Sequence, residues 1–216
     1  MENSSVSLWL FDLRPWMDDW RSFLPLLSPQ RRARVLSCYR EEDSVRLAGA
    51  GVLLRHALVT AGVPVSEQIF ETNTWGKPYL ASGALEFSLS HAGFYAACAV
   101  GKGALGVDVE APRFSMTLAE HCFHPQELSY LKLLSCTERP DAWLRIWTAK
   151  EAYIKYLGRG LSVPLSSFRV ELTPSGARLY QNETALPERL HEYPLGAYRL
   201  CLCASVSRPS LQFYTP

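Results

Sequence analysis

The sequence of 216 residues lacks a strong net charge, because 22 lysine and arginine residues stand against 21 aspartate and glutamate residues and leave +1. It therefore lacks the overall positive field of a general nucleic-acid or membrane-surface binder, and a charged partner has to meet a local patch. It also has no apolar run of about 18 residues, and the best candidate, 47–62, is interrupted by Arg55 and His56. The chain is therefore not expected to span a membrane.

The first residues lack a basic segment ahead of an apolar run, and Glu2 and Asp12 flank the apolar residues instead. A secretory signal is not expected, and we expect a cytoplasmic protein. The six cysteines form no C-x-x-C pair, and a chain of this length can build a core without disulfides. We expect free, mostly buried thiols. Cys201 and Cys203 would share one strand face, which for a metal site would still need further ligands nearby.

What the sequence does contain is typical of a globular protein, with 48% hydrophobic, 12% aromatic and 20% charged residues. At about 150 residues a domain, its length fits one large domain or two closely packed halves. Helices are predicted at 30–39, 44–61, 117–123, 125–134 and 140–157, and strands at 6–13, 104–109, 168–172, 177–181, 198–206 and 211–214. The run 86–100 is predicted to form consecutive short strands, with a break at Ala92-Gly93. Helices followed by strands, twice over, favour an α+β chain in two halves, 1–111 and 112–216.

Two carboxylates share one face of a predicted strand in the segment from Gly106 to Glu110. Because alternate strand residues point the same way, Asp108 and Glu110 lie together, and the neighbouring valines pack on the other side. Two acids on one face are costly without a positive partner, and a hard divalent cation such as Mg²⁺ meets that need. A half-exposed strand end with two solvated acids is the alternative.

A second cluster comes late in the last predicted helix. Glu151 and Lys155 are four residues apart, in the favourable orientation for a surface ion pair. Trp147 lies on the same face one turn earlier, which favours contact of that face with protein or ligand. Taken with the carboxylate strand, Glu151 could supply a third metal ligand and Lys155 a cation for a phosphate.

The segment Phe87 to His91 places a serine and a histidine side by side. Adjacent strand residues point to opposite faces, so Ser90 and His91 cannot form a nucleophile and base pair. No G-x-S-x-G motif accompanies them. Contact with a phosphate is favoured over nucleophilic catalysis, and a structural turn is the alternative.

Basic residues gather between positions 29 and 60. Arg31 and Arg34 are three residues apart and can converge on one anion, as can Arg46 from the next element. A solvated helix face is the alternative. Lys77 adds a cation in a predicted turn, and Glu127 lies in the first turn of a helix, where an acid is expected for the helix dipole alone.

Together and in this order, these motifs resemble the 4′-phosphopantetheinyl transferases of the long, single-chain Sfp type. The matching residues are Arg31-x-x-Arg34, Arg46, Gly76-Lys77-Pro78, Ser90-His91, Gly106-x-Asp108-x-Glu110 and Trp147-x-x-Lys150-Glu151-x-x-x-Lys155. The resemblance implies an enzyme that moves the phosphopantetheine arm of coenzyme A onto a serine hydroxyl of an apo acyl, polyketide or peptidyl carrier protein and releases 3′,5′-ADP. It also implies two similar α/β halves packed pseudo-symmetrically, with the active site at their interface.

The resemblance assigns roles to particular residues. It implies that Asp108, Glu110 and Glu151 hold Mg²⁺ on the coenzyme A diphosphate, and that Lys155 binds the diphosphate and assists departure of the ADP side. It further implies contacts with coenzyme A by Arg31, Arg34, Arg46, Lys77, Ser90 and His91. Glu127 would help to deprotonate the incoming serine, directly or through water.

Two other functional classes are weighed against this one. A non-catalytic coenzyme A or nucleotide-binding module could dispense with the acids, yet all three acids and Lys155 are present. An Mg²⁺-dependent phosphohydrolase would need a positioned water and usually more acids. We expect a monomeric transferase that binds neither nucleic acid nor membrane. Fatty-acid, polyketide and non-ribosomal peptide carriers all fit this expectation.

Overall fold

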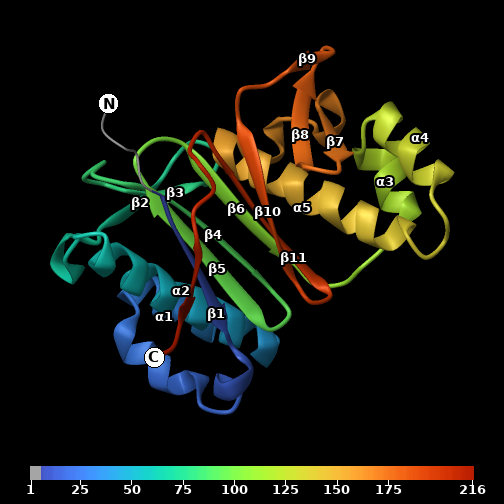
Figure 1. The fold of residues 1–216 in the computed structure, drawn as a ribbon. Helices are drawn as coiled ribbons and strands as arrows, with labels where there is room; N and C mark the ends of the chain where they lie inside the picture. Colours follow the sequence, from blue (N-terminus) through green and yellow to red (C-terminus); the bar gives the residue numbers. More distant parts are fainter. Residues whose placement is uncertain (1–5) are drawn as a thin grey trace.

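Two halves of matching topology make up the chain, which the computed structural model describes from residue 6 to residue 216, apart from the side chain of Leu161 (Figure 1). The first half contains β1 (Val6–Asp12), α1 (Pro29–Leu36), α2 (Glu41–Thr60), β2 (Phe70–Thr72), β3 (Pro78–Leu80), β4 (Glu86–Ala92) and β5 (Tyr95–Gly101). The second half contains β6 (Leu105–Glu110), α3 (Met116–Cys122), α4 (Pro125–Leu133), α5 (Arg139–Leu157), β7 (Arg169–Thr173), β8 (Gly176–Gln181), β9 (Thr184–Ala185), β10 (Arg189–Leu195), β11 (Tyr198–Ala204) and β12 (Leu211–Tyr214). Short 3₁₀ helices lie at Arg14–Trp16, Trp20–Leu26, Val65–Glu67, Gly160–Ser162 and Leu165–Ser167.

The strand order of the first half is repeated in the second. Strands β1, β5 and β4 are antiparallel neighbours, and β6, β11 and β10 follow one another in the same way. Each half also packs its long helix on its own sheet, α2 against β5 and α5 against β6 and β11. The predicted α+β fold of two similar halves is confirmed. The boundary between residues 111 and 112 stays a prediction, since β6 lies before it and pairs with β11 after it.

The end of the chain returns to the first half. Strand β12 runs parallel to β1 and pairs Leu211 with Leu8 and Tyr214 with Phe11 (Figure 1). The segment before it is held by Tyr193, whose hydroxyl donates to the carbonyl oxygen of Pro209 at 2.6 Å. The chain therefore crosses between the halves twice, once before β6 and once before β12.

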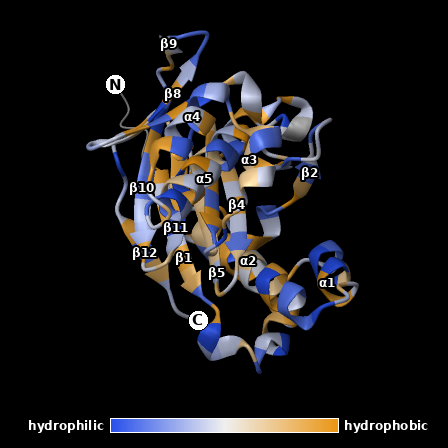
Figure 2. Cartoon of the chain, turned by 90° about the vertical axis from the view of Figure 1, so that its right-hand side faces the viewer, coloured by the Kyte–Doolittle hydropathy of each residue, from blue (hydrophilic) through white to orange (hydrophobic). Residues whose placement is uncertain are grey.

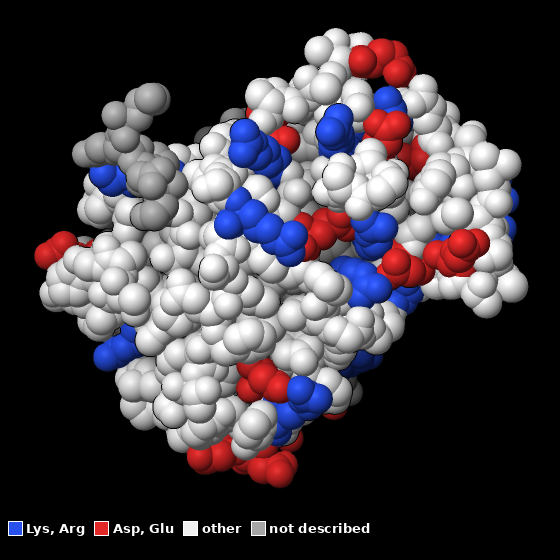
Figure 3. Space-filling view, viewed as in Figure 1, with Lys and Arg blue, Asp and Glu red and all other residues white. Residues whose placement is uncertain are grey.

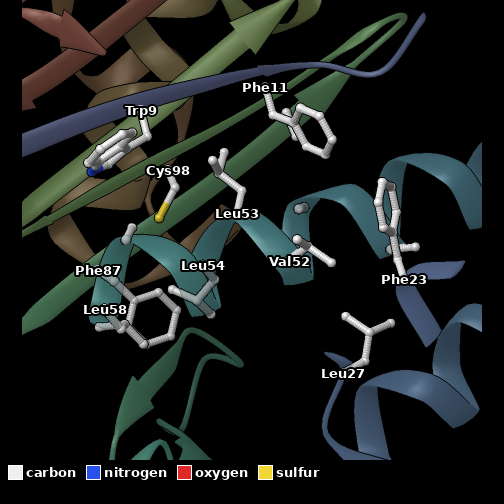
Figure 4. Packing of buried hydrophobic residues seen from close by; sticks show 14 of the residues in the cluster. Trp9, Phe11, Phe23, Leu27, Val52, Leu53, Leu54, Leu58, Phe87 and Cys98 are labelled. Atoms are coloured by element: carbon white, nitrogen blue, oxygen red, sulfur yellow. The ribbon is translucent and has the colours of Figure 1, made fainter. Parts of the chain in front are cut away.

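Strand alternation sends neighbouring side chains to opposite sides of each sheet. In the first sheet, Trp9, Phe11 and Cys98 point toward α2 and pack against its side chains, including Leu53 and Leu54 (Figure 4). The opposite faces of both sheets share one apolar layer, which includes Leu8, Leu10, Ala97, Ala99, Val107, Val109, Leu200 and Leu202. The order of layers is therefore α2, first sheet, second sheet, α5, with hydrophobic residues gathered in the strands (Figure 2).

This layering determines where the acids of β6 point. The two valines of β6 lie in the shared apolar layer, so the alternate residues Gly106, Asp108 and Glu110 face α5. Gly106 allows the strand to lie directly on the helix, because a Cβ there would be 2.1 Å from the carbonyl oxygen of Ala152 and 2.2 Å from the nitrogen of Tyr156. The helix that carries Glu151 and Lys155 is thereby held against the strand that carries the other two acids.

The sequence pattern does not predict β2, β3, β10 or the two-residue strand β9. The first two have three residues each, which is too short for alternation to be recognised. In β10 the neighbours Leu190 and His191 are both buried and Pro194 interrupts the pattern. A proline is tolerated there because β10 is an edge strand of its sheet. The five predicted helices are present, although α2 begins at Glu41, three residues before the predicted start.

All six cysteines are free, as expected, but only Cys98, Cys201 and Cys203 are buried. The prediction of mostly buried thiols is therefore only half right, since Cys136 is exposed and the remaining two are half-buried. Between residues 6 and 216, no helix combines the length and the apolar character needed to cross a membrane.

Replacing Gly106 by alanine is expected to reduce the free energy of unfolding by about 3 kcal/mol, because the new methyl group meets helix backbone rather than a flexible side chain. Urea unfolding of the purified variant measures this loss. Gly103→Ala is the control: a Cβ there meets nothing within 4 Å, and its φ of +81° accounts for a smaller loss, about 1 kcal/mol. Equal losses in the two variants would contradict the close approach of β6 to α5 as the reason for Gly106.

Candidate functional site

Asp108 lies where the two halves meet. Its Oδ1 accepts hydrogen bonds from Ser90 Oγ of β4 at 2.8 Å and from Lys155 Nζ of α5 at 2.7 Å. The side chain of Ser88, two residues earlier on β4, accepts the backbone N–H of Val107 at 3.0 Å. Only 3% of Asp108 is exposed, and its Oδ2 is buried without a hydrogen-bond partner. Such an orphaned carboxylate oxygen is rare in a folded protein and marks a place for a missing donor or cation.

Glu110 is held by two donors on one oxygen. Its Oε1 accepts from Arg113 Nη2 at 2.7 Å and from Trp147 Nε1 at 2.8 Å. Burial and the nearby charge of Asp108 nevertheless raise the pKa of Glu110 to about 7. The two donors therefore offset only part of the cost of placing this carboxylate beside another one.

The charge of Asp108 also reaches Glu151 of α5. Burial, and then the charge of Asp108, raise the pKa of Glu151, while Lys155 and Arg113 act in the opposite direction. Asp108 thus acts on both glutamates, one from its own strand and one from α5. The three acids that the sequence selected are therefore linked electrostatically through Asp108.

A cavity of about 340 Å³ opens beside these acids and is lined by both halves. Its charged and polar lining residues are Arg31, Arg34, Ser90, His91, Asp108, Glu110 and Lys155. The arginines come from α1 and the acids from β6, so one wall is basic and the other acidic. Such a division suits a multiply charged anion together with a cation that bridges it to the carboxylates.

The basic wall carries charge that its own surroundings do not offset. Burial and the charge of Arg34 lower the pKa of Arg31, and within residues 6–216 no carboxylate is paired with Arg31. Burial, Lys155 and Arg46 lower the pKa of His91 to about 4. The imidazole is therefore neutral near pH 7, so it can donate one hydrogen bond without adding to the positive charge.

Two of the predicted binding residues lie outside this cavity lining. Arg46 is paired with Asp43 on its own helix at 2.5 Å, although its charge still acts on His91. Lys77 donates from Nζ to the carbonyl oxygen of Leu105 at 3.2 Å, and burial lowers its pKa. Lys77 lines an adjoining, mostly apolar cavity that shares Lys155 with the first.

Glu127 is not brought to the other acids. Its Oε1 accepts the backbone N–H of Val170 at 2.6 Å, and its Oε2 accepts that of His124 at 2.7 Å and lies 2.9 Å from Lys150 Nζ. Both charged side chains are fully buried, and Lys150 also donates to the carbonyl oxygens of Leu165 and Phe168. This geometry gives Glu127 a structural role between α4, α5 and β7, and it offers no support for the expected role in serine deprotonation.

Sequence reasoning missed residues that hold the site through long-range contacts. Asn73 accepts the N–H groups of Trp75 and Lys77 on its Oδ1 and donates from Nδ2 to the carbonyl oxygen of Gly158 at 2.8 Å. It therefore ties the turn between β2 and β3 to the end of α5, one turn after Lys155. The local signal was an asparagine ahead of a glycine in a turn, which indicates the turn but not the tether.

The donors in the cleft fit a hard cation such as Mg²⁺, because they are carboxylate oxygens and one of them, Asp108 Oδ2, is buried without a partner. As the side chains stand, the described residues contain no ready-made group of three or more His, Cys, Asp and Glu that could hold a metal ion. Instead of a metal ion, Lys155 is paired with an oxygen of Asp108, and Arg113 is paired with an oxygen of Glu110. A cation would therefore be received by a site that side-chain ammonium and guanidinium groups already neutralise in part.

Comparison with known proteins identifies relatives of this chain. A family model described as the 4′-phosphopantetheinyl transferase superfamily matches residues 104–203. The 4′-phosphopantetheinyl transferase Sfp of Bacillus subtilis (strain 168) is 30% identical over 85% of this chain and 84% of its own length. The 4′-phosphopantetheinyl transferase psf-1 of Bacillus pumilus is 33% identical over 83% of this chain and 79% of its own. A holo-(acyl-carrier-protein) synthase structure from Bacillus anthracis str. Ames, in complex with CoA (3′,5′-ADP), covers 46% of this chain and 92% of its own with 19% identity and a TM-score of 0.39.

Replacing Glu127 by leucine is expected to lower the free energy of unfolding by about 3–5 kcal/mol, because the Lys150 ammonium is left buried without its partner. Urea unfolding measures the loss. The double variant Glu127→Leu, Lys150→Met is expected to recover much of the lost free energy of unfolding. It is also expected to retain turnover when assayed well below the urea concentration at which half of it unfolds. A double variant that is stable but inactive would instead support a direct chemical role for Glu127.

Proposed function

Because the chain belongs to the 4′-phosphopantetheinyl transferase family, we propose that the cavity between its two halves is the active site. The enzyme transfers the 4′-phosphopantetheine group of coenzyme A to a serine hydroxyl of a carrier protein and releases 3′,5′-ADP. The observation that carries this placement is the pairing of a basic wall with an acidic wall across one cavity, with Lys155 between them. Coenzyme A has a 3′-phosphate and a diphosphate, so it needs cations at more than one point.

The basic wall receives the phosphates of coenzyme A. Arg31 and Arg34 offer guanidinium groups that can bind phosphate through two parallel hydrogen bonds. His91 of β4, neutral near pH 7, contributes a single hydrogen-bond donor. Its neighbour Ser90, also on β4, orients Asp108 of β6 through a hydrogen bond. Arg46 and Lys77 act from the rim, Arg46 through its charge beside His91 and Lys77 from the adjoining cavity.

Mg²⁺ would be held at the acidic wall by Asp108 and Glu110 of β6, together with Glu151 of the adjacent helix α5. Asp108 has Oδ2 free for this role, since Oδ1 is already bonded to Ser90 and Lys155. When bound, Mg²⁺ supplies charge neutralisation on the diphosphate, which is the main requirement of phosphoryl transfer.

The chain's own residues then position the reacting groups. The serine oxygen of the carrier protein bonds to the phosphorus nearer pantetheine, and the bond from that phosphorus to the bridging oxygen breaks. Lys155 is fixed by Asp108 at 2.7 Å and lies in the cavity, where its ammonium stabilises the departing phosphate of 3′,5′-ADP. Glu151 accepts no hydrogen bond from any described residue, which leaves its oxygens open to a ligand or to the serine proton.

We also infer that the enzyme works as a monomer in the cytoplasm on an apo acyl, polyketide or peptidyl carrier protein. A single chain supplies both walls of the cavity, so the site needs no second copy. Its six free thiols suit a reducing compartment. Ranking a panel of apo carriers by kcat/KM identifies the carrier class.

Replacing Asp108 or Glu151 by alanine is expected to abolish transfer while the protein stays folded, because each change removes a proposed carboxylate ligand of Mg²⁺. The measurement is the intact mass of an apo carrier protein after incubation with the enzyme, coenzyme A and Mg²⁺. Glu120→Ala, which removes an exposed acid of α3, is the control and is expected to transfer normally. Transfer retained by Asp108→Ala or Glu151→Ala would contradict the metal assignment, and hydrolysis of coenzyme A without a carrier adduct in the wild type would indicate a phosphohydrolase.

A further inference from the structure

Arg113 follows β6 in the loop before α3, and the function proposed above gives it no role. Its Nη2 lies 2.7 Å from Glu110 Oε1. An isolated ion pair of this kind at the surface contributes little, because a long side chain loses conformational freedom when it is held. Arg113 differs from such a residue, because contacts other than the ion pair with Glu110 already restrict its guanidinium group.

The guanidinium of Arg113 lies on the tryptophans of α5. Its central carbon is 4.6 Å from the ring centre of Trp147 and 5.6 Å from that of Trp143. The two indole rings are parallel within 2°, with centres 5.5 Å apart, and the ring of Phe123 lies beside both, 5.8 Å from Trp143 and 6.4 Å from Trp147. Trp143 is fully buried and Trp147 is 9% exposed, so the platform is rigid. A planar cation on such a platform is held both by the ring faces and by packing.

The same platform also contacts Glu110 directly. Trp147 Nε1 donates to Glu110 Oε1 at 2.8 Å, which is the oxygen that Arg113 already binds. Two donors, one of them stacked on the other, thus converge on this one oxygen. The second oxygen, Oε2, receives neither donor.

We propose that Arg113 is a positioning residue, which with Trp147 occupies Glu110 Oε1 and leaves Oε2 as the single oxygen that Glu110 offers to the cation. This inference rests on the proposed role of Glu110 as a ligand. It adds that Glu110 binds the cation through one oxygen only, and that Arg113 and Trp147, which do not line the cavity, determine how Glu110 is oriented. Loss of a group that orients a metal ligand in this way typically weakens metal binding by about 10- to 100-fold.

Calorimetric titration of Mg²⁺ into the protein with coenzyme A present tests the effect on the cation. We expect Arg113→Met to bind Mg²⁺ about 10-fold more weakly than the wild type. Arg113→Lys is expected to lie between the two, because it retains the charge and loses the planar stack. Unchanged Mg²⁺ binding in Arg113→Met would show that the ion pair between Arg113 and Glu110 has no effect on the metal site. Tighter Mg²⁺ binding would show that Arg113 only competes with the cation. Either result overturns the proposal.

The metal-free protein provides a second measurement. In a ¹H–¹⁵N spectrum, the indole N–H of Trp147, identified by its loss in Trp147→Phe, is expected to move upfield in Arg113→Met as Glu110 is released. A resonance that stays in place would contradict the positioning role. Arg208→Met is the matched control, since Arg208 also stacks on an aromatic ring, that of Tyr193 at 4.5 Å, and lies in the second half away from the cavity lining.

A further variant separates this inference from the proposed function. Asp108→Asn is expected to lose Mg²⁺ binding if the acidic wall is the metal site. If Asp108→Asn binds Mg²⁺ as the wild type does, the metal assignment fails, and the Trp147 resonance alone still decides whether Arg113 positions Glu110. If Asp108→Asn loses binding and Arg113→Met does not, the metal site stands and the role of Arg113 is refuted.

Discussion

Repulsion of Glu110 and Glu151 by the carboxylate of Asp108 is the constraint on which the candidate site depends. Asp108 raises the pKa of both Glu110 and Glu151, and burial of these glutamates contributes even more. Charges removed from water in this way are tolerated only when nearby donors and cations offset the desolvation. Ser90 and Lys155 do so at Asp108, and Arg113 does so at Glu110. The offset is incomplete, because one oxygen of Asp108 still lacks any partner. The remaining imbalance supports the proposal that the cleft receives a divalent cation and the anion that accompanies it.

Both halves of the chain supply side chains to the candidate site. The second half supplies all three acids, and the first half supplies the arginines of α1 and the serines of β4. Gly106 lets β6 lie on the backbone of α5, which brings acids of the strand and the helix together. Acidic and basic side chains are interspersed over the face shown in Figure 3, without a single-sign field there. The chain has a net charge of only +1, and this is compatible with a site for a highly charged ligand. Arginines and acids line the same cavity, so their opposite charges cancel in the total while each remains available locally.

Alternation and helix spacing were sufficient to predict the parts of the site that depend on local geometry. The common face of Asp108 and Glu110 follows from strand alternation, and the shared face of Trp147, Glu151 and Lys155 follows from the helical repeat. Contacts between distant segments could not be predicted in this way. Glu127 fits a first-turn acid in sequence, and only the fold shows that Lys150 is its partner. Lys77 was selected for its charge, yet its ammonium turns to the carbonyl oxygen of Leu105. Asn73 and Arg113 act through Gly158 and the tryptophan platform, which no local pattern indicates.

A crystal structure of the protein with coenzyme A and Mn²⁺ in place of Mg²⁺ tests the central claim most directly, because the anomalous signal locates the metal without reference to activity. The account predicts one peak within about 2.3 Å of carboxylate oxygens from Asp108, Glu110 and Glu151. It also predicts that Arg31 and Arg34 contact phosphate groups on the opposite wall. A peak bonded to the diphosphate alone, or lying away from these three acids, would contradict it.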